Sequence, residues 1–234
     1  MSTISDQESL DREKQAAARA SLNFIKDGDI VGLGSGSTAT YAIRFLAERV
    51  RDGLKIRGIP TSVKSHDLAA SLGIPLTTLE ECPQIDVDID GADEIDPQLN
   101  LIKGGGGALL REKVIASASR KFVVIAESVK QVPFLGAFPL PVEVIPFAEP
   151  VLTRRITDLG AKVRLRTYAY GNPYKTDEGH HILDCLFGQI AYPVTLARQL
   201  QEMPGVVEHG LFIGMASIAL IGKKDEVVEL QRKE

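Results

Sequence analysis

Two short stretches of the chain hold most of the residues whose types suit acid–base catalysis. In residues 86–94, apolar and acidic side chains alternate until a glycine interrupts the pattern, so Asp90 and Asp93 fall where a strand ends. In the second stretch, Lys103 precedes four glycines, and Glu112 lies in the helix-like segment that follows. A carboxylate can remove a proton from a carbon next to a carbonyl while neighbouring polar groups stabilise the enediolate. We therefore predict proton transfer, with Glu112 as the best candidate base.

Each of these residues alone has a plainer explanation. An acid in the first turn of a helix, as Glu112 would be, is stabilised by the helix dipole, and Asp93 suits a turn or a cap. Two aspartates, a lysine and a glutamate around one glycine run are harder to explain as a solvated surface. Glycines allow a backbone to approach a small anionic ligand closely, which favours the catalytic interpretation.

A second candidate site is the loop Gly34-Ser-Gly-Ser-Thr38, between the first predicted strand and the next helix. Free backbone N–H groups and the positive end of the helix dipole would face an anion there. The loop is not a dinucleotide fingerprint, because Ser37 replaces the third glycine and no acid follows the second strand; a Walker loop would need a Gly-Lys pair. What remains is a phosphate site with hydroxyls from Ser35, Ser37 and Thr38, and hence a phosphorylated polyol as substrate. The alternative is a glycine-rich turn that packs the helix on the strand.

Strands alternate with helices in the first part of the chain, which predicts an α/β fold with a doubly wound, Rossmann-like, mostly parallel sheet. The expected helices lie at about 10–25, 40–50, 65–72 (capped by Ser65) and 111–120, and the expected strands at 29–33, 55–59, 74–79, 85–89 and 121–126. The carboxyl ends of such strands form one rim, where the acids and the Ser35–Thr38 loop should meet. Central parallel strands are usually apolar on both faces, and the sequence offers no account of Asp88.

From about Pro133 the pattern changes, because prolines cluster between residues 133 and 150. Strands near 142–145, 162–166, 181–187 and 206–211 alternate with helices near 151–159 and 194–203 in the order β-α-β-β-α-β. This order predicts a smaller α+β domain of the ferredoxin-like kind, inserted near the C-terminus. We predict a Rossmann-like catalytic domain at 1–136 and 210–234 and the small domain, a candidate for oligomer contact, at 137–209. The tail beyond 216 should return to the first sheet.

Composition excludes several classes of protein. The 234 residues are 44% apolar with a net charge of −4, so a packed core is expected and nucleic acid is a poor candidate partner. No apolar run is long enough to span a membrane, and the acidic N-terminus does not resemble a signal peptide, so we expect a cytoplasmic protein. The two cysteines are interpreted as reduced, and the spacing of the four histidines suggests no metal site.

Several co-linear motifs together make nearly the whole chain resemble type A ribose-5-phosphate isomerase. They are Gly34-Ser-Gly-Ser-Thr38, Asp90-Gly-Ala-Asp-Glu94, Lys103-Gly-Gly-Gly106 through Arg111-Glu-Lys113, Phe138-Pro-Leu-Pro-Val-Glu-Val-Ile-Pro146, Ile182-Leu-Asp184 and Pro204-Gly-Val-Val207. The resemblance implies interconversion of D-ribose 5-phosphate and D-ribulose 5-phosphate in the non-oxidative pentose phosphate pathway. It also implies no metal or organic cofactor, and a homodimer or homotetramer.

The resemblance further implies a role for each site residue. Glu112 would move the proton between C2 and C1, Asp90 and Asp93 would assist ring opening and proton movement among the oxygens, and Lys103 would stabilise negative charge. The implied substrate contacts are Lys14, Ser35, Gly36, Ser37, Thr38, Asp90, Gly91, Ala92, Asp93, Lys103, Gly104, Gly105, Gly106 and Lys130. Two positions depart from the family pattern: Ser35 stands where many relatives have threonine, and Gly107, which should loosen the loop, where several have alanine.

Two other classes of function stay open. A sugar-phosphate sensing module of a transcription regulator would need only the anion loop, but we expect about 28 residues before the first strand to leave no room for a DNA-binding segment. A different enzyme on the same fold, such as an amino-sugar phosphate deaminase or a CoA transferase, is the other alternative. Assaying ribose 5-phosphate against glucosamine 6-phosphate would separate most of these possibilities.

Overall fold

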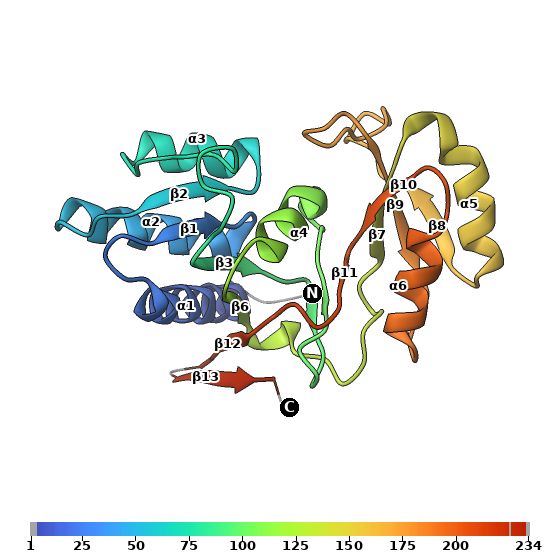
Figure 1. Ribbon diagram of the computed structural model, residues 1–234. Helices are drawn as coiled ribbons and strands as arrows, with labels where there is room; N and C mark the ends of the chain where they lie inside the picture. The colour runs from blue at the N-terminus through green and yellow to red at the C-terminus, as the bar shows by residue number, and fades with distance from the viewer. Residues whose placement is uncertain (1–3, 225, 233–234) are drawn as a thin grey trace. The chain divides into compact units, whose positions relative to one another are not determined.

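The computed structural model describes residues 4–224 and 226–232 (Figure 1). Their contacts group into two compact units. Unit 1 takes in the described residues of Met1–Ala92, Arg111–Gln131 and Met215–Glu234, and unit 2 takes in Asp93–Leu110 and Val132–Gly214. The sequence had placed residues 93–110 with the first domain, whereas their contacts are with unit 2. As domain boundaries, the predicted ranges stay predictions.

Unit 1 is built on a six-stranded sheet with the order β13-β12-β6-β3-β1-β2. Its strands are β1 (Ile30–Leu33), β2 (Arg57–Pro60), β3 (Val87–Gly91), β6 (Phe122–Glu127), β12 (Ile218–Lys223) and β13 (Glu226–Gln231). All neighbouring strands are parallel except β12 and β13. β1 and β6 are buried along their whole length, as central strands of a doubly wound sheet are. The predicted mostly parallel α/β sheet is therefore confirmed.

Helices cover both faces of this sheet. They are α1 (Ile4–Ser21), α2 (Ser37–Arg51), α3 (Val63–Ser71) and α4 (Leu109–Ser117), with the short 3-10 turns η1 (Leu22–Phe24) and η2 (Ser128–Lys130). The first three helices share a core with Val31 of β1. α4 covers the other face, because its Ile115 packs with Ile30, the neighbour of Val31 that points the opposite way. The alternation of apolar residues along β1 thus supplies two cores.

Three local predictions were wrong. α3 is capped by Ser62, whose Oγ accepts a hydrogen bond from the Ser65 N–H at 3.1 Å while the Ser65 Oγ accepts from the Ser62 N–H at 3.0 Å. Ser65 is therefore the third residue of a capping box rather than the cap. The strand expected at 74–79 is reduced to one bridge between Leu76 and Gly58. β3 ends at Gly91 and not at the expected residue 89, so Asp90 lies within the strand.

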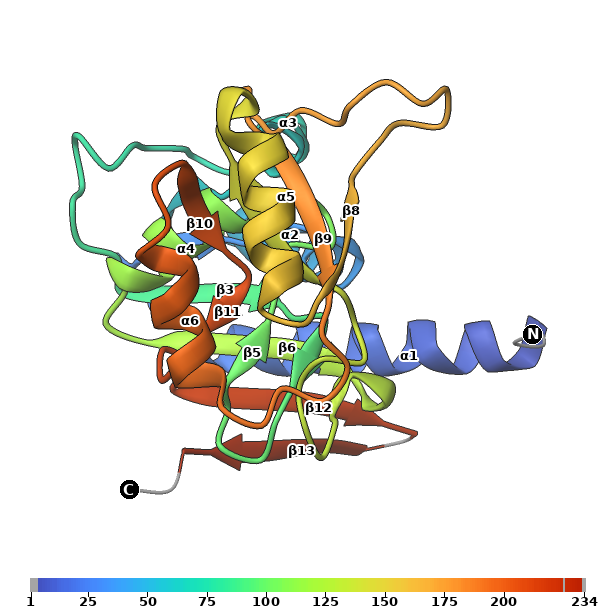
Figure 2. The ribbon, with the colours of Figure 1, turned by 90° about the vertical axis from the view of Figure 1, so that its right-hand side faces the viewer.

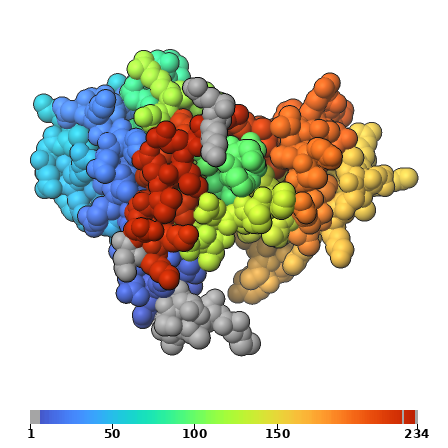
Figure 3. Space-filling view, turned by 90° about the horizontal axis from the view of Figure 1, so that it is seen from below, coloured from blue at the N-terminus to red at the C-terminus, as the bar shows by residue number. Residues whose placement is uncertain are grey.

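The C-terminal hairpin completes unit 1, as predicted. β12 pairs with β6, and β13 runs antiparallel beside it at the edge of the sheet (Figure 2). In the space-filling view the hairpin, in red, lies beside the blue N-terminal part of the chain (Figure 3). A Cβ at Gly222 of β12 would lie 2.0 Å from the carbonyl oxygen of Glu13 in α1, so this crossing requires a glycine.

Unit 2 contains a four-stranded antiparallel sheet with the order β10-β7-β9-β8. Its elements are β7 (Leu140–Val144), η3 (Pro146–Ala148), α5 (Glu149–Asp158), β8 (Lys162–Leu165), β9 (His181–Leu186), α6 (Pro193–Gln201) and β10 (Val206–His209). The chain order and the strand order are those of the predicted ferredoxin-like unit. Apolar residues of α5 and α6 pack on one face of the sheet. A second, three-stranded sheet joins β4 (Glu94–Ile95), β5 (Leu101–Ile102) and β11 (Leu211–Phe212).

Candidate active site

In unit 1, the buried carboxylate of Asp90 holds the loop that follows β1. The Asp90 Oδ1 accepts hydrogen bonds from the backbone N–H groups of Ser35, at 2.9 Å, and Gly91, at 2.7 Å. The Gly34 N–H donates to the carbonyl oxygen of Ile89 at 3.0 Å, so strand pairing continues into the loop. Asp90 is fully buried. These two hydrogen bonds from backbone N–H groups fix the loop on β3.

Gly34 is required by this arrangement. A Cβ at Gly34 would lie 2.2 Å from the Asp90 Oδ1 and 2.6 Å from the Asp90 Cα. The second contact is with backbone, so no rotation of the Asp90 side chain would relieve it. The loop approaches β3 this closely because residue 34 has no side chain.

Hydroxyl groups from two strand ends meet in the same loop. The Ser35 Oγ lies 2.8 Å from the Thr61 Oγ1 and 2.7 Å from the Ser62 Oγ, just after β2. Sequence reasoning missed Thr61 and Ser62, although hydroxyls directly after a strand of a parallel sheet were a signal for this rim. The Thr38 Oγ1 donates to the Glu127 Oε2, at the end of β6, at 3.5 Å. Gly36, with φ 96°, precedes the first residue of α2, and the N–H groups of that first turn favour an anion.

Glu112 occupies the first turn of α4 and is 4% exposed. A carboxylate this buried is costly unless neighbouring groups stabilise its charge or hold its proton. The predicted position at a helix start is thus found, and the burial adds a property that the sequence did not reveal.

Lys14 and Lys130 lie on two segments of unit 1 that a hydrogen bond joins. The Glu13 Oε2 in α1 accepts from the Ser128 N–H at the start of η2 at 2.9 Å. Lys14 is the next residue along α1, with its Nζ 3.5 Å from the Asp11 Oδ1, and Lys130 ends η2. Glu13 therefore brings the two lysine-bearing segments together. Its own Oε1 accepts from the Lys224 N–H at 2.9 Å.

Unit 2 holds the other predicted residues. The Asp93 N–H donates to the Ile102 carbonyl at 2.8 Å, and the Asp93 Oδ2 accepts from the Gly105 N–H at 2.7 Å. Lys103 is 2% exposed; its N–H donates to the Gly210 carbonyl at 2.9 Å. Its Nζ lies 5.5 Å from the centre of the Phe212 ring, within the range of a cation–π interaction. Asp93 directly precedes β4 and Lys103 directly follows β5, so both residues lie at the open end of this short hairpin.

The glycine run after Lys103 forms a defined loop. Gly104 and Gly107 have φ of 98° and 86°, which favours glycine, and the Gly107 N–H donates to the Gly104 carbonyl at 2.9 Å. Gly105 and Gly106 are exposed. A Cβ at Gly107 would lie 2.3 Å from the hydroxyl oxygen of Tyr174. Glycine at position 107 therefore leaves room for a tyrosine, and the looser loop expected from this glycine stays a prediction.

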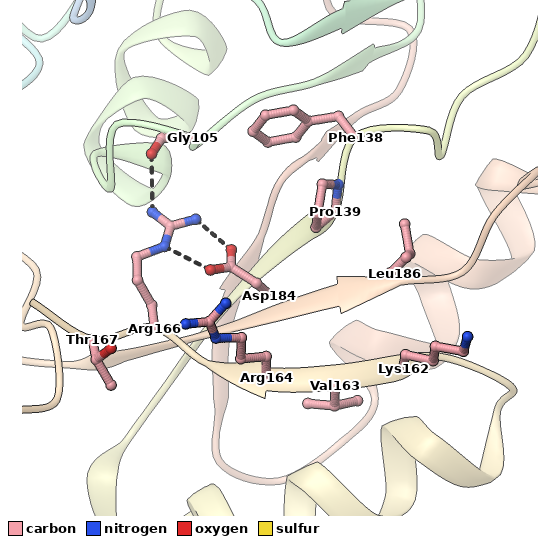
Figure 4. Close-up of a pocket in the computed structure, with 10 residues that line it drawn as sticks. All are labelled: Gly105, Phe138, Pro139, Lys162, Val163, Arg164, Arg166, Thr167, Asp184 and Leu186. Atoms are coloured by element: carbon pink, nitrogen blue, oxygen red, sulfur yellow. Dashed lines mark hydrogen bonds and ion pairs between the residues drawn. The ribbon is translucent and has the colours of Figure 1, made fainter. Parts of the chain in front are cut away.

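Arg166 and Asp184 support this loop, and neither is among the site residues predicted from the sequence. The Arg166 guanidinium forms a two-bond ion pair with Asp184 and donates from Nη1 to the carbonyl oxygen of Gly105 at 3.1 Å (Figure 4). The same Nη1 donates to the carbonyl oxygen of Gly104 at 3.0 Å. Arg166, Asp184 and Gly105 border a cavity of about 560 Å³ within unit 2. Its other lining residues are Phe138, Pro139, Lys162, Val163, Arg164, Thr167 and Leu186.

The predicted site residues thus fall into two groups. Unit 1 carries Lys14, Ser35, Gly36, Ser37, Thr38, Asp90, Gly91, Ala92, Glu112 and Lys130, and unit 2 carries Asp93, Lys103, Gly104, Gly105 and Gly106. Among residues 4–224 and 226–232, no group of three or more His, Cys, Asp or Glu side chains is placed to hold a metal ion. No helix in that part of the chain is long and apolar enough to cross a membrane.

Known proteins resemble this chain in sequence and in fold. The family model for ribose 5-phosphate isomerase A (phosphoriboisomerase A) matches residues 57–226. A ribose-5-phosphate isomerase A of Parvibaculum lavamentivorans is 49% identical, with 94% of this chain and 98% of the relative covered, and one of a Synechococcus species is 51% identical, with 96% and 99% covered.

Solved structures agree. A D-ribose-5-phosphate isomerase in complex with phospho-erythronic acid has a TM-score of 0.93 at 39% identity, with 95% of this chain and 99% of that chain covered. The ribose 5-phosphate isomerase of Plasmodium falciparum has a TM-score of 0.92 at 35% identity, with 96% and 100% covered.

Proposed function

This chain belongs to the ribose 5-phosphate isomerase A family, and we propose that Glu112 is the base in its interconversion of D-ribose 5-phosphate and D-ribulose 5-phosphate. The observation that carries the proposal is a carboxylate 4% exposed in the first turn of α4, five residues after the end of the Gly104–Gly107 loop.

The reaction moves one proton between two neighbouring carbons. In the open-chain aldose, the Glu112 carboxylate takes the proton from C2, and the C–H electron pair forms the C1–C2 double bond while the carbonyl oxygen at C1 becomes an oxyanion. The protonated Glu112 then returns the proton to C1, and C2 becomes the carbonyl carbon of the ketose. Proton movement between the two oxygens completes the exchange, so no external oxidant or reductant is needed.

The other predicted residues have distinct roles in this proposal. Asp90 and Asp93 assist ring opening and carry protons among the oxygens. The Lys103 ammonium stabilises the developing oxyanion, because a fixed charge in a site without water is worth more than in bulk solvent. Lys14 and Lys130, together with the loop from Ser35 to Thr38, bind the phosphate end of the substrate.

The burial of Glu112 supports its role as a base. Burial keeps water away from this carboxylate, so the proton that it takes from one carbon can be returned to the next carbon without loss to solvent. The helix dipole favours a negative charge in the first turn of α4.

Replacing Glu112 with glutamine tests the proposal. Glu112→Gln preserves size and polarity but removes the base, so kcat should fall by about 10²–10⁴-fold while KM changes little. Glu149→Gln is the matched control, because Glu149 also lies in a first helical turn, that of α5, outside the proposed site. We expect the control to keep normal turnover. Near-normal kcat in a folded Glu112→Gln protein would refute Glu112 as the base.

The ligand of the solved relative suggests a second test. Phospho-erythronic acid carries a phosphate and a carboxylate, whose two oxygens share negative charge as those of an enediolate do. We propose that it binds this chain and competes with ribose 5-phosphate in the isomerase assay. Glucosamine 6-phosphate, assayed in parallel, separates the isomerase from an amino-sugar phosphate deaminase.

We also propose that the protein is a cytoplasmic homodimer or homotetramer that assembles through unit 2. Large apolar side chains are exposed at the starts of its two helices: Phe147 and Val151 near α5, and Tyr192 and Val194 near α6. Light scattering on the purified chain and on a Phe147→Asp/Val194→Asp variant tests this. A monomeric wild-type protein would refute assembly, and an unchanged oligomer in the variant would refute this surface.

A further inference from the structure

The Arg166–Asp184 pair lies where a side chain can set the shape of the glycine loop. Arg166 is the first residue after strand β8. Asp184 lies in the neighbouring strand β9, where it is the register partner of Arg164. The Arg166 Nε donates to the Asp184 Oδ2 at 3.0 Å, and its Nη2 donates to the Asp184 Oδ1. The Arg166 side chain is 15% exposed and that of Asp184 24%, so the pair is partly shielded from water.

The remaining terminal nitrogen of Arg166 binds two successive carbonyl groups. Nη1 donates to the carbonyl oxygens of both Gly104 and Gly105. Only an arginine has the planar fork that can bind a carboxylate through one edge and two carbonyls through the other nitrogen; a lysine has a single charged nitrogen. Asp184 therefore fixes the orientation of the guanidinium (Figure 4), and the guanidinium fixes two peptide groups of the loop.

The first of these peptide groups is held at both ends. The C=O of Gly104 accepts from Arg166, and the N–H of Gly105, in the same peptide plane, donates to the Asp93 Oδ2 at 2.7 Å. In a trans peptide the C=O and the N–H point in opposite directions. Arg166 thus sets the direction from which the loop meets Asp93, one of the proposed catalytic residues.

The second peptide group presents a donor. The C=O of Gly105 accepts from Arg166, so the N–H of Gly106 points away from the guanidinium. Gly106 is exposed, and within the described residues its N–H donates to no protein acceptor. The following C=O, that of Gly106, accepts from the Tyr174 hydroxyl at 3.4 Å. Burial raises the pKa of Tyr174, although Arg166 acts in the opposite direction, so this hydroxyl stays protonated and able to donate.

We propose that Arg166, oriented by Asp184, is a positioning residue that presets the Gly106 N–H as a hydrogen-bond donor to an oxygen of the enediolate. Arg166 itself does not touch the substrate in this proposal. A donor that is already oriented stabilises the transition state without reorganisation at the moment of reaction. The inference rests on the proposed function, because the oxyanion arises only if this chain carries out the isomerisation.

Steady-state kinetics of two conservative variants test the proposal. Arg166→Lys keeps the positive charge but loses the fork, and Asp184→Asn keeps the shape but leaves one guanidinium nitrogen without its acceptor. Each should lower kcat by roughly 10–100-fold with KM within about threefold, because a misplaced donor weakens transition-state binding more than substrate binding. The double variant should lose little more than the worse single variant, since the two residues act as one unit.

Arg164→Lys is the matched control. Arg164 lies two residues earlier, lines the same cavity and is exposed, and no contact between it and the glycine loop is present in the described structure. We expect its kcat to stay within about twofold of wild type, because it exchanges one exposed cation for another. A folded Arg166→Lys protein with wild-type kcat would overturn the proposal.

Backbone order in the wild-type protein provides a test that does not depend on the variants. If Arg166 presets the loop, the ¹⁵N order parameters of Gly105 and Gly106 without substrate should approach about 0.85, as in rigid backbone; values below about 0.6 would refute the inference even if the variants fail to fold. The wild-type assay separates the proposed function from the positioning role of Arg166. An inactive wild-type protein would refute the proposed function, whereas an active one with an indifferent Arg166→Lys variant would refute only the positioning role.

Discussion

Substituting alanine for Gly34 should damage both the stability and the activity of this protein. The new Cβ would lie 2.6 Å from the Asp90 Cα and 2.4 Å from its Cγ, whereas carbon atoms in van der Waals contact are about 3.5–4.0 Å apart. The loop and β3 would have to separate by roughly 1 Å at this point. That movement would weaken the bonds to the Asp90 Oδ1 from the N–H groups of Ser35 and Gly91, which now measure 2.9 and 2.7 Å.

The size of the effect follows from these two terms. Overpacking a well-packed interior typically costs about 1–3 kcal/mol, and a buried polar group that loses its hydrogen bonds costs about 1–3 kcal/mol, so we expect a loss of about 3–5 kcal/mol in the free energy of unfolding. For a chain of this length that corresponds to a fall of roughly 10 °C in Tm. A shift of about 1 Å in a substrate-binding loop should also lower kcat/KM by about 10²-fold.

Gly91→Ala is the matched control for stability. Gly91 also adjoins Asp90, but a Cβ there would meet only backbone oxygens at 3.8 and 3.9 Å, which is ordinary contact, and its φ is not positive. We expect the free energy of unfolding of this variant to lie within about 1 kcal/mol of the wild-type value. Urea unfolding followed by circular dichroism measures both variants. If Gly34→Ala were as stable as Gly91→Ala, the close approach of the loop to Asp90 would not be a real constraint.

Two further predictions follow from buried titratable groups. Burial alone would raise the pKa of Glu13, but hydrogen bonds from the N–H groups of Lys224 and Ser128 outweigh it and lower the pKa below its ordinary value. The resulting stability is present above the unfolded pKa near 4.3 and is lost as pH falls through the folded value. Glu13→Gln should therefore lower the midpoint urea concentration of unfolding at pH 7 and make that midpoint depend less on pH between about pH 5 and 3. An unchanged pH profile would contradict this. Burial raises the pKa of the Cys185 thiol well above its usual range, whereas Cys82 is half-buried. A thiol reagent should therefore label Cys82 in the native protein and Cys185 only after unfolding, as followed by mass spectrometry. Rapid labelling of both cysteines would show that unit 2 opens readily.

Local patterns predicted the fold well because each depended on neighbours in the chain. The alternation of Ile30 and Val31 between two cores, and the β-α-β-β-α-β order of unit 2, are visible in short windows of sequence. Boundaries were less secure. Ser65 looked like a helix cap, yet Ser62 takes that role because either serine can accept the hydrogen bond and only the preceding backbone decides between them.

The missed site residues depend on contacts that short windows do not contain. Arg166 reaches Gly104 across 62 residues of chain, and it meets Asp184 only because β8 and β9 pair in a register that places Arg164 opposite Asp184. A shift of one residue would turn each side chain to the other face of the sheet. The acids at 90 and 93 were recognisable by their types and spacing, whereas the pair that supports the glycine loop acquires its role from the folded sheet.

The glycines and aspartates of this chain explain one another. Gly32 in β1 and Gly34, directly after it, lie on the same face. A Cβ at Gly32 would lie 2.5 Å from the Asp88 carboxylate, and one at Gly34 would lie 2.2 Å from the Asp90 carboxylate. Gly32 and Asp88 are direct partners in the β1–β3 register. Buried carboxylates beside a neighbouring strand need space and N–H donors, and a strand without side chains at alternate positions supplies the space.

The same relation recurs in unit 2, where a Cβ at Gly105 would lie 2.7 Å from the Asp93 Oδ1 while the Gly105 N–H donates to the Oδ2 of the same residue. Asp88 therefore has a physical place, although sequence alone gave none: it occupies the room that Gly32 leaves. A carboxylate that faces a glycine across a strand pair can stay buried without pushing the backbones apart. This is why a Gly-x-Gly segment at the end of one strand and an Asp-x-Asp segment in its partner belong to a single structural requirement.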